Sequence, residues 1–391
     1  MLISIALILL SGLFVDYIFR KMKLPGLIGM IIVGIVLGPY ALNLIDSSIL
    51  NVAGELRQIA LVIILTRAGL SLDLADLKKV GRPAILMCFV PACTEMVGTI
   101  IFAPLLLGIT ILEAAIIGSV IAAVSPAVVV PRMIRLMEEG YGQTKSIPQL
   151  ILAGASVDDV FVIVVFTVLT AFASTGEIMA TSFLQIPISI ILGILLGTIV
   201  GLILVLFFKK VHLRDSIKVL IILSISFLFL DAQSRLEGIV PISGLLAIMS
   251  MGITINQRYD VLSKRLSEKY NKLWIGAEIF LFVLVGVAVD LKYAFSAGLF
   301  AILLVLLALI FRMLGVLLSL VKTDLNKKER VFCMLSYTPK ATVQAAIGTI
   351  PLAMGLDCGS IVLTVAVISI LITAPLGAIC IDNLYRKMLT K

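Results

Sequence analysis

The sequence has little charge and no long hydrophilic stretch. Only 14% of its 391 residues are Asp, Glu, Lys or Arg, whereas 61% are hydrophobic, and the mean hydropathy is +1.20. Soluble domains carry a much larger charged fraction, so this composition excludes a soluble protein, and no stretch is long enough for a separate soluble domain. We expect a single all-helical membrane domain over residues 1–391.

Histidine and cysteine are also scarce. The one histidine, His212, lies in a basic loop, and the five cysteines contain no C-x-x-C pair. A structural metal site, a disulfide framework and a histidine proton relay are therefore not expected. We expect no cofactor and interpret the cysteines as small core residues.

Apolar segments long enough to cross a bilayer recur along the whole chain. Thirteen can be counted, with ends uncertain by several residues. They are 2–19, 25–45, 57–74, 83–107, 110–135, 148–172, 184–208, 216–232, 237–255, 272–290, 296–321, 330–354 and 358–384. The first could be mistaken for a signal peptide, but it lacks a basic leader and a cleavage site, so we expect a retained span.

Basic residues alternate between the loops. The loops after odd-numbered spans, together with the C-terminal tail, hold 25 of the 31 Lys and Arg residues, and the even loops hold three. The positive-inside rule then predicts an N-terminus outside and a C-terminus inside. The net charge of +8 reflects this topology, and no nucleic-acid partner is needed to explain it.

Two adjacent aspartates, Asp158 and Asp159, lie within the apolar run 151–167. Each carboxylate near the membrane midplane costs ~2.5–3.5 kcal/mol on insertion scales. Such a pair is retained only if a cation, a proton or a buried base compensates it. The pair therefore indicates a transport protein.

Two spans are interrupted midway by hydroxyl residues and proline, at 110–135 and 330–354. The residues at the interruptions are Ser125 and Pro126 in the first span, and Thr338, Pro339 and Thr342 in the second. Proline frees backbone carbonyls inside a membrane helix. Because the two spans are seven apart, they cross in opposite directions, which is typical of inverted-repeat transporters. We expect repeats at 1–175 and 216–385, with 184–208 as a linking span.

Three further charges lie deep in apolar segments: Lys340, Glu95 and Arg312. Lys340 lies at the second interruption, where its ammonium could neutralise one of the aspartates. Glu95 and Arg312 occupy equivalent positions in the two repeats and have opposite signs, so they could form a structural or a modulating ion pair.

Three motifs resemble one known family. Ser-Pro-Ala-Val-Val-Val-Pro (125–131), Ser-Val-Asp-Asp-Val (156–160) and Thr-Pro-Lys-Ala-Thr-Val-Gln-Ala-Ala-Ile-Gly (338–348) are similar to those of the monovalent cation/proton antiporters of the CPA2 type. Within that group they resemble most the bacterial and animal NHA-like sodium/proton antiporters. The resemblance covers nearly the whole chain.

This resemblance implies an NhaA/NapA-like fold in which two discontinuous helices cross. It also implies a homodimer, with a moving core at 83–172 and 296–385 and a dimerisation panel at 1–74 and 216–290. Asp159 would bind the cation and the proton alternately, while Asp158 would pair with Lys340. The implied location is a prokaryotic inner (plasma) membrane, where the chain is multi-pass and in contact with lipid.

The expected function is exchange of Na⁺ (or Li⁺) for H⁺ by an elevator mechanism. The transported Na⁺ would lie at Asp159, and oxygen ligands near Ser125, Pro126, Ser156 and Thr342 are candidates. A K⁺/H⁺ antiporter, a channel and a Na⁺-coupled solute symporter remain alternatives. An intramembrane aspartyl protease needs two aspartates from different helices, so adjacent aspartates argue against an enzyme.

Overall fold

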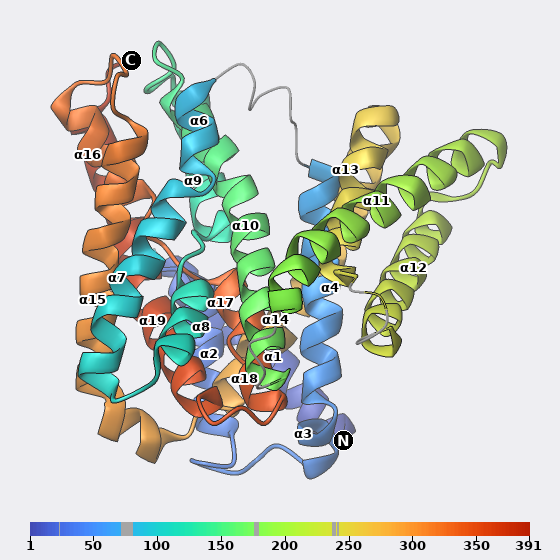
Figure 1. Ribbon diagram of the computed structural model, residues 1–391, viewed down its shortest axis with the longest axis horizontal. Helices are drawn as coiled ribbons and strands as arrows, with labels where there is room; N and C mark the ends of the chain where they lie inside the picture. The colour runs from blue at the N-terminus through green and yellow to red at the C-terminus, as the bar shows by residue number, and fades with distance from the viewer. Residues whose placement is uncertain (23, 72–80, 176–179, 237–239, 241) are drawn as a thin grey trace. The chain divides into compact units, whose positions relative to one another are not determined.

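The computed structural model describes residues 1–22, 24–71, 81–175, 180–236, 240 and 242–391, and over these residues its regular secondary structure is helical, with no strand. Figure 1 shows the helices. They are α1 (Leu2–Lys21), α2 (Gly26–Leu37), α3 (Ser47–Asn51), α4 (Ala53–Ser71), α6 (Arg82–Met87), α7 (Val90–Leu107), α8 (Ile111–Ile121), α9 (Pro126–Glu139), α10 (Ile147–Thr175), α11 (Ala180–Lys210), α12 (Asp215–Arg235), α13 (Gly244–Arg258), α14 (Asp260–Val287), α15 (Leu291–Ser319), α16 (Lys327–Ser336), α17 (Thr342–Ile347), α18 (Ile350–Ala353) and α19 (Gly359–Met388).

Many of these helices have the length and composition of membrane spans. Eight described segments meet both criteria, and α2 and the stretch Thr342–Ala353 are apolar but shorter. The chain is therefore a multi-pass helical membrane protein. The count of thirteen spans and the orientation of the termini stay predictions.

The chain divides into two compact units. The first unit comprises 1–53, 75–174 and 279–391, and the second comprises 54–74 and 175–278. The expected core, 83–172 and 296–385, falls in the first unit. Residues 1–53, which we assigned to the dimerisation panel, belong to that same unit. The expected division into a moving core and a fixed panel stays a prediction.

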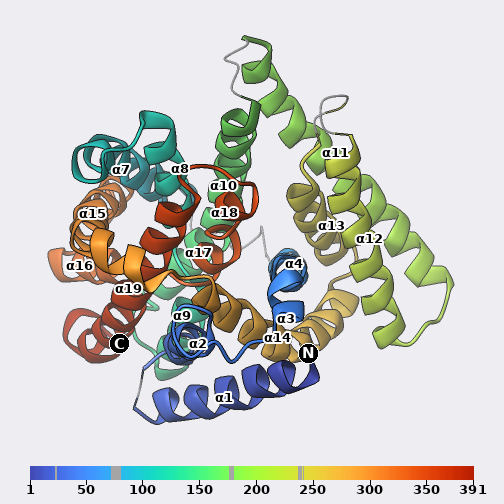
Figure 2. The same ribbon diagram turned by 90° about the horizontal axis from the view of Figure 1, so that it is seen from below.

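In the first unit, α7 lies along α15, and α19 contacts both α15 and α16 (Figures 1 and 2). Two glycines bring α2 and the end of α14 into backbone contact. A Cβ atom on Gly34 would lie 2.0 Å from the Val283 carbonyl oxygen, and one on Gly286 would lie 2.1 Å from the Ile31 carbonyl oxygen. Close approach through small residues is the usual way in which helices associate in lipid.

Cysteine burial differs in part from the expectation. The thiols of Cys88, Cys333 and Cys358 are buried, but Cys93 is exposed on α7. A helix in a bilayer has an outward face that needs no burial, so an apolar span does not place each of its small residues in the core.

In the second unit, α11 packs along α13 through a glycine at every fourth position. Gly193, Gly197 and Gly201 all face α13, and a Cβ atom on Gly197 would lie 2.1 Å from the Ala247 carbonyl oxygen. This G-x₃-G-x₃-G stripe lets the two backbones touch.

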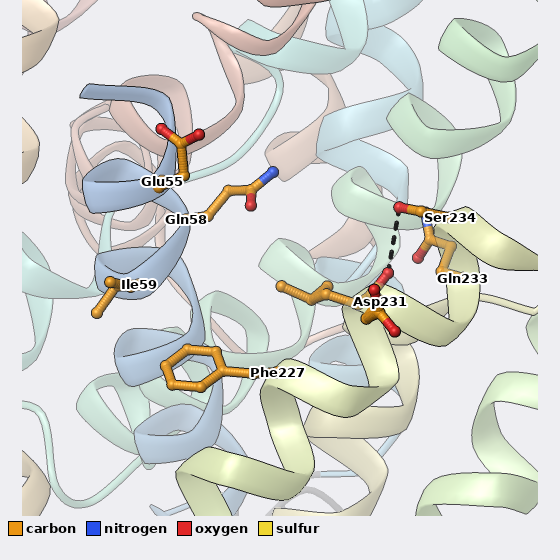
Figure 3. Close-up of a pocket in the computed structure, with 8 residues that line it drawn as sticks. Glu55, Gln58, Ile59, Phe227, Asp231, Gln233 and Ser234 are labelled. Atoms are coloured by element: carbon orange, nitrogen blue, oxygen red, sulfur yellow. Dashed lines mark hydrogen bonds between the residues drawn. The ribbon is translucent and has the colours of Figure 1, made fainter. Parts of the chain in front are cut away.

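A cavity of about 470 Å³ also lies in the second unit (Figure 3). Glu55, Gln58 and Ile59 of α4 line one side. The residues of α12 that line the other side are Phe227, Leu230, Asp231, Gln233 and Ser234. Its acidic residue on α12, Asp231, is paired with Arg235 at 2.7 Å.

We expect Gly197→Ala to destabilise the purified protein. The added methyl group has no space, and overpacking of this kind costs ~1–3 kcal/mol. Gly276→Ala in α14 is the matched control, because no atom lies within 4 Å of its Cβ position, and there alanine should stabilise the helix slightly. Thermal unfolding in detergent measures both. Equal melting temperatures for the two variants would contradict the close packing of α11 on α13.

Candidate functional site

Two helices of the first unit stop and restart in the middle of the core. The first interruption separates α8 from α9 and spans 122–125, and the second separates α16 from α17 and spans 337–341. Proline disfavours helical backbone in the residue before it, which explains breaks at Pro126 and Pro339. The two interruptions touch, because the Ser125 N–H donates to the Pro339 carbonyl oxygen at 2.7 Å.

Both aspartates lie on α10, and Asp158 reaches the first interruption. Asp158 is fully buried, and its Oδ2 accepts hydrogen bonds from the Val124 N–H at 2.9 Å and from Arg312 Nη2 at 2.8 Å. Asp159 is half-buried. In the part of the chain that the structure describes, Oδ1 of Asp158 and Oδ1 of Asp159 have no hydrogen-bond partner.

Four charged side chains form a continuous buried chain of contacts, which we call the charge cluster: Lys340, Glu95, Arg312 and Asp158. Lys340 Nζ lies 2.7 Å from Glu95 Oε1, and Arg312 Nη1 lies 2.8 Å from Glu95 Oε2. Arg312 Nη2 then binds Asp158. All four side chains are 0% exposed. Two cations and two carboxylates balance, so the cluster has no net charge when all four are ionised.

The pairing differs from the one expected. Asp158 is bound to Arg312, and Lys340 is bound to Glu95, whereas we expected Asp158 to bind Lys340. The reason is geometric, since the guanidinium has donors on two sides and spans Glu95 and Asp158 at once. Glu95 and Arg312 do form an ion pair, but within a cluster of four.

The cations also hold backbone carbonyls that the first interruption frees. Lys340 Nζ donates to the Ile121 carbonyl and Arg312 Nη1 donates to the Ala122 carbonyl. At the second interruption, Arg312 Nε donates to the Tyr337 carbonyl at 2.5 Å. These carbonyls are therefore occupied by the protein's own donors, although we expected some of them to serve as ion ligands.

The hydroxyl residues of the two interruptions are not equivalent. Thr338 Oγ1 donates to the Leu335 carbonyl at 2.8 Å, so its proton is used locally. Ser125 and Thr342 are buried, and their hydroxyl oxygens have no hydrogen-bond partner among the described residues. The side chain of Ser156 lies outside the described ones.

Three further residues take part that the sequence did not single out. The Tyr337 ring lies under the Arg312 guanidinium at 5.1 Å, and its hydroxyl donates to the Met87 carbonyl at 3.1 Å. Thr373 Oγ1 accepts from the Lys340 N–H at 2.9 Å. Gln344 donates to the Val120 carbonyl in α8 and to the Ala123 carbonyl in the first interruption. Gln344 lies within the motif 338–348 and Tyr337 directly precedes it, but neither residue type has a distinctive signal of its own.

Comparison with known proteins agrees with this geometry. The family model described as "Sodium/hydrogen exchanger, transmembrane" matches residues 5–386. Sodium/hydrogen exchanger 9B2 of Mus musculus is 32% identical over 385 residues, which cover 94% of this chain and 69% of the relative. Sodium/hydrogen exchanger 9B1 of Homo sapiens is 32% identical over 384 residues, which cover 94% and 73%.

A solved structure has the same fold. The sodium proton antiporter MjNhaP1 of Methanocaldococcus jannaschii superposes with a TM-score of 0.82 at 20% identity, over 97% of each chain. The predicted antiporter-like fold is confirmed at this level. Together the matches confirm the resemblance that the motifs indicated: this chain belongs to the sodium/hydrogen exchanger family and is a cation/proton antiporter.

Proposed function

We propose that the protein exchanges Na⁺ (or Li⁺) for H⁺, and that both ions bind in turn at Asp159. The observation that carries this proposal is the charge balance of the site. Asp158 lies in the neutral charge cluster, whereas Asp159 makes no ion pair among the described residues and its Oδ1 has no hydrogen-bond partner. A carboxylate within a membrane span that has no fixed partner needs a proton or a cation.

The unpartnered oxygens support a cation site beside Asp159. Among the described residues, the buried oxygens of Ser125, Thr342 and Asp158 Oδ1 lack partners, and buried polar groups are normally satisfied. All are hard oxygen donors, which suit a small hard cation. Two other expected ligands already make hydrogen bonds to the backbone: the Thr338 hydroxyl donates to the Leu335 carbonyl, and the Pro339 carbonyl accepts from the Ser125 N–H.

The packing of the first unit supports a core that moves as one body. Midway along α9, Arg132 pairs with Asp382 of α19 at 3.1 Å, and at the end of α9 Glu139 accepts a hydrogen bond from Tyr385 of α19 at 2.7 Å. We propose an elevator movement of the core, 83–172 and 296–385, in a homodimer with inverted repeats and a cytoplasmic C-terminus. The proposed location is a prokaryotic plasma membrane.

The names of the relatives favour Na⁺, because the curated relatives named above are sodium/hydrogen exchangers. A K⁺/H⁺ antiporter or a Na⁺-coupled solute symporter on the same scaffold remains the second candidate. The oxygen-only ligand set favours a bare cation over an organic solute.

We expect Asp159→Asn to abolish exchange, because asparagine neither ionises nor carries a proton. Purified protein in liposomes under an imposed pH gradient, with a pH-sensitive dye inside, measures proton movement on addition of Na⁺, Li⁺ or K⁺. Asp158→Asn should weaken exchange, because Arg312 loses one of its anions. Normal Na⁺-driven proton movement in folded Asp159→Asn would disprove the assignment.

We expect wild-type exchange to be electroneutral, since Asp159 carries either one Na⁺ or one H⁺ and the charge cluster stays neutral. Rates should change less than about twofold when a K⁺ gradient with valinomycin imposes 100 mV. Transport of one net charge would instead gain or lose ~2.3 kcal/mol at that potential. A steep dependence on potential would show that a residue of the charge cluster also gives up a proton.

We expect Glu95→Gln to destabilise the protein by about 3–5 kcal/mol, because two buried cations lose their shared anion. Glu138→Gln is the control, as Glu138 is exposed near the end of α9 and surface changes have small effects. Thermal unfolding with and without 1 M NaCl measures both variants. Equal stability of the two would mean that Glu95 is not the anion that holds Arg312 and Lys340 in place.

A further inference from the structure

Four consecutive carbonyls, those of residues 120–123, lie where α8 ends and the first interruption begins, and helical hydrogen bonding stops there. Side chains from the second half of the chain donate to each of them. Two of the donors, Lys340 and Arg312, belong to the charge cluster. The third is the uncharged amide of Gln344, whose Nε2 donates to the Val120 carbonyl at 3.2 Å and to the Ala123 carbonyl at 2.9 Å. Because the amide is neutral, the need to balance buried charges does not explain why Gln344 is at this position.

Gln344 is saturated and fully buried. Its Oε1 accepts from the Ala341 N–H at 2.8 Å, and its exposed fraction is 0%. The side chain therefore links the first turn of α17 to the last carbonyls of α8. Ala341 directly precedes Thr342, and Ala123 lies two residues before Ser125. The amide thus ties together the two backbone segments that carry the unpartnered hydroxyls.

We propose that Gln344 is a positioning residue for the transported cation. It sets the separation between the Ser125 and Thr342 hydroxyls, and it keeps the Ala123 carbonyl out of the ligand set. This inference rests on the proposed cation site at Asp159 and adds a determinant of cation affinity to it. A proton needs only one carboxylate oxygen, whereas a dehydrated cation needs several oxygens at fixed distances. Gln344 therefore controls cation binding without controlling proton binding.

Gln344→Met tests this inference, because methionine fills a similar volume but offers neither the amide donors nor the carbonyl acceptor. In liposomes, the KM for Na⁺ should rise about tenfold, equivalent to ~1.4 kcal/mol, while the maximal rate stays within about twofold. Protons compete with Na⁺ and so raise the apparent KM for Na⁺ as the pH falls. The pH at which this apparent KM is twice its value at high pH should be the same in Gln344→Met as in the wild type. The ratio of the Li⁺ and Na⁺ KM values should also shift.

The matched control is Gln149→Met, which removes an amide from α10 whose Oε1 has no partner among the described residues. It should leave the KM for Na⁺ unchanged. If Gln344→Met does not fold, Gln344→Asn, which keeps an amide one methylene shorter, replaces it with the same expected shift. Size-exclusion profiles and Na⁺-dependent thermal stabilisation confirm folding and binding independently of transport.

The outcomes separate the two proposals. An unchanged KM in Gln344→Met, an equal shift in Gln149→Met, or a parallel change in the proton dependence would each overturn the positioning role. If the positioning role of Gln344 is overturned but Asp159→Asn is inactive in the same assay, the proposed cation site at Asp159 is still supported. Exchange that survives Asp159→Asn overturns the site itself.

Discussion

The carbonyls at the end of α8 are the constraint on which the core depends. A lipid interior offers no water to bind them, so every freed backbone group must find a donor within the protein. Their donors come from the second half of the chain: Lys340, Arg312 and Gln344. The carbonyl end of a helix also carries partial negative charge, which favours cations there. The two halves are held together because donors from the second half satisfy the carbonyls at the first interruption, and the Ser125 N–H of the first half satisfies the Pro339 carbonyl of the second.

This arrangement supports the proposal that only one acid of the aspartate pair exchanges ions. Neighbouring helix positions point about 100° apart, so Asp158 can face Arg312 and the Val124 N–H while Asp159 faces elsewhere. The first aspartate thus completes the scaffold. The second keeps an oxygen unpartnered among the described residues, as the proposed ion site requires.

The local features of the site were predictable from sequence, and the contacts between distant elements were not. Pro126 and Pro339 act on their own backbone, so the positions of both interruptions could be predicted. Buried charges are rare enough to identify Asp158, Arg312 and the rest of the cluster. The choice of partners depends on side-chain reach in three dimensions, and for that reason the expected Asp158–Lys340 pair was wrong. Gln344 went unnoticed because a glutamine in a polar motif has no distinctive sequence signal.

The charge cluster also has a consequence for biosynthesis. Glu95 and Asp158 are made well before their partners, because Arg312 follows Asp158 by 154 positions and Lys340 follows Glu95 by 245. At ~5–20 residues per second, the first carboxylates wait on the order of 10 s or more for a cation. During that interval α7 and α10 must be held by the insertion machinery, by water or by protonation. The cation that completes each of these buried pairs therefore becomes available only after α15 has been made, late in synthesis.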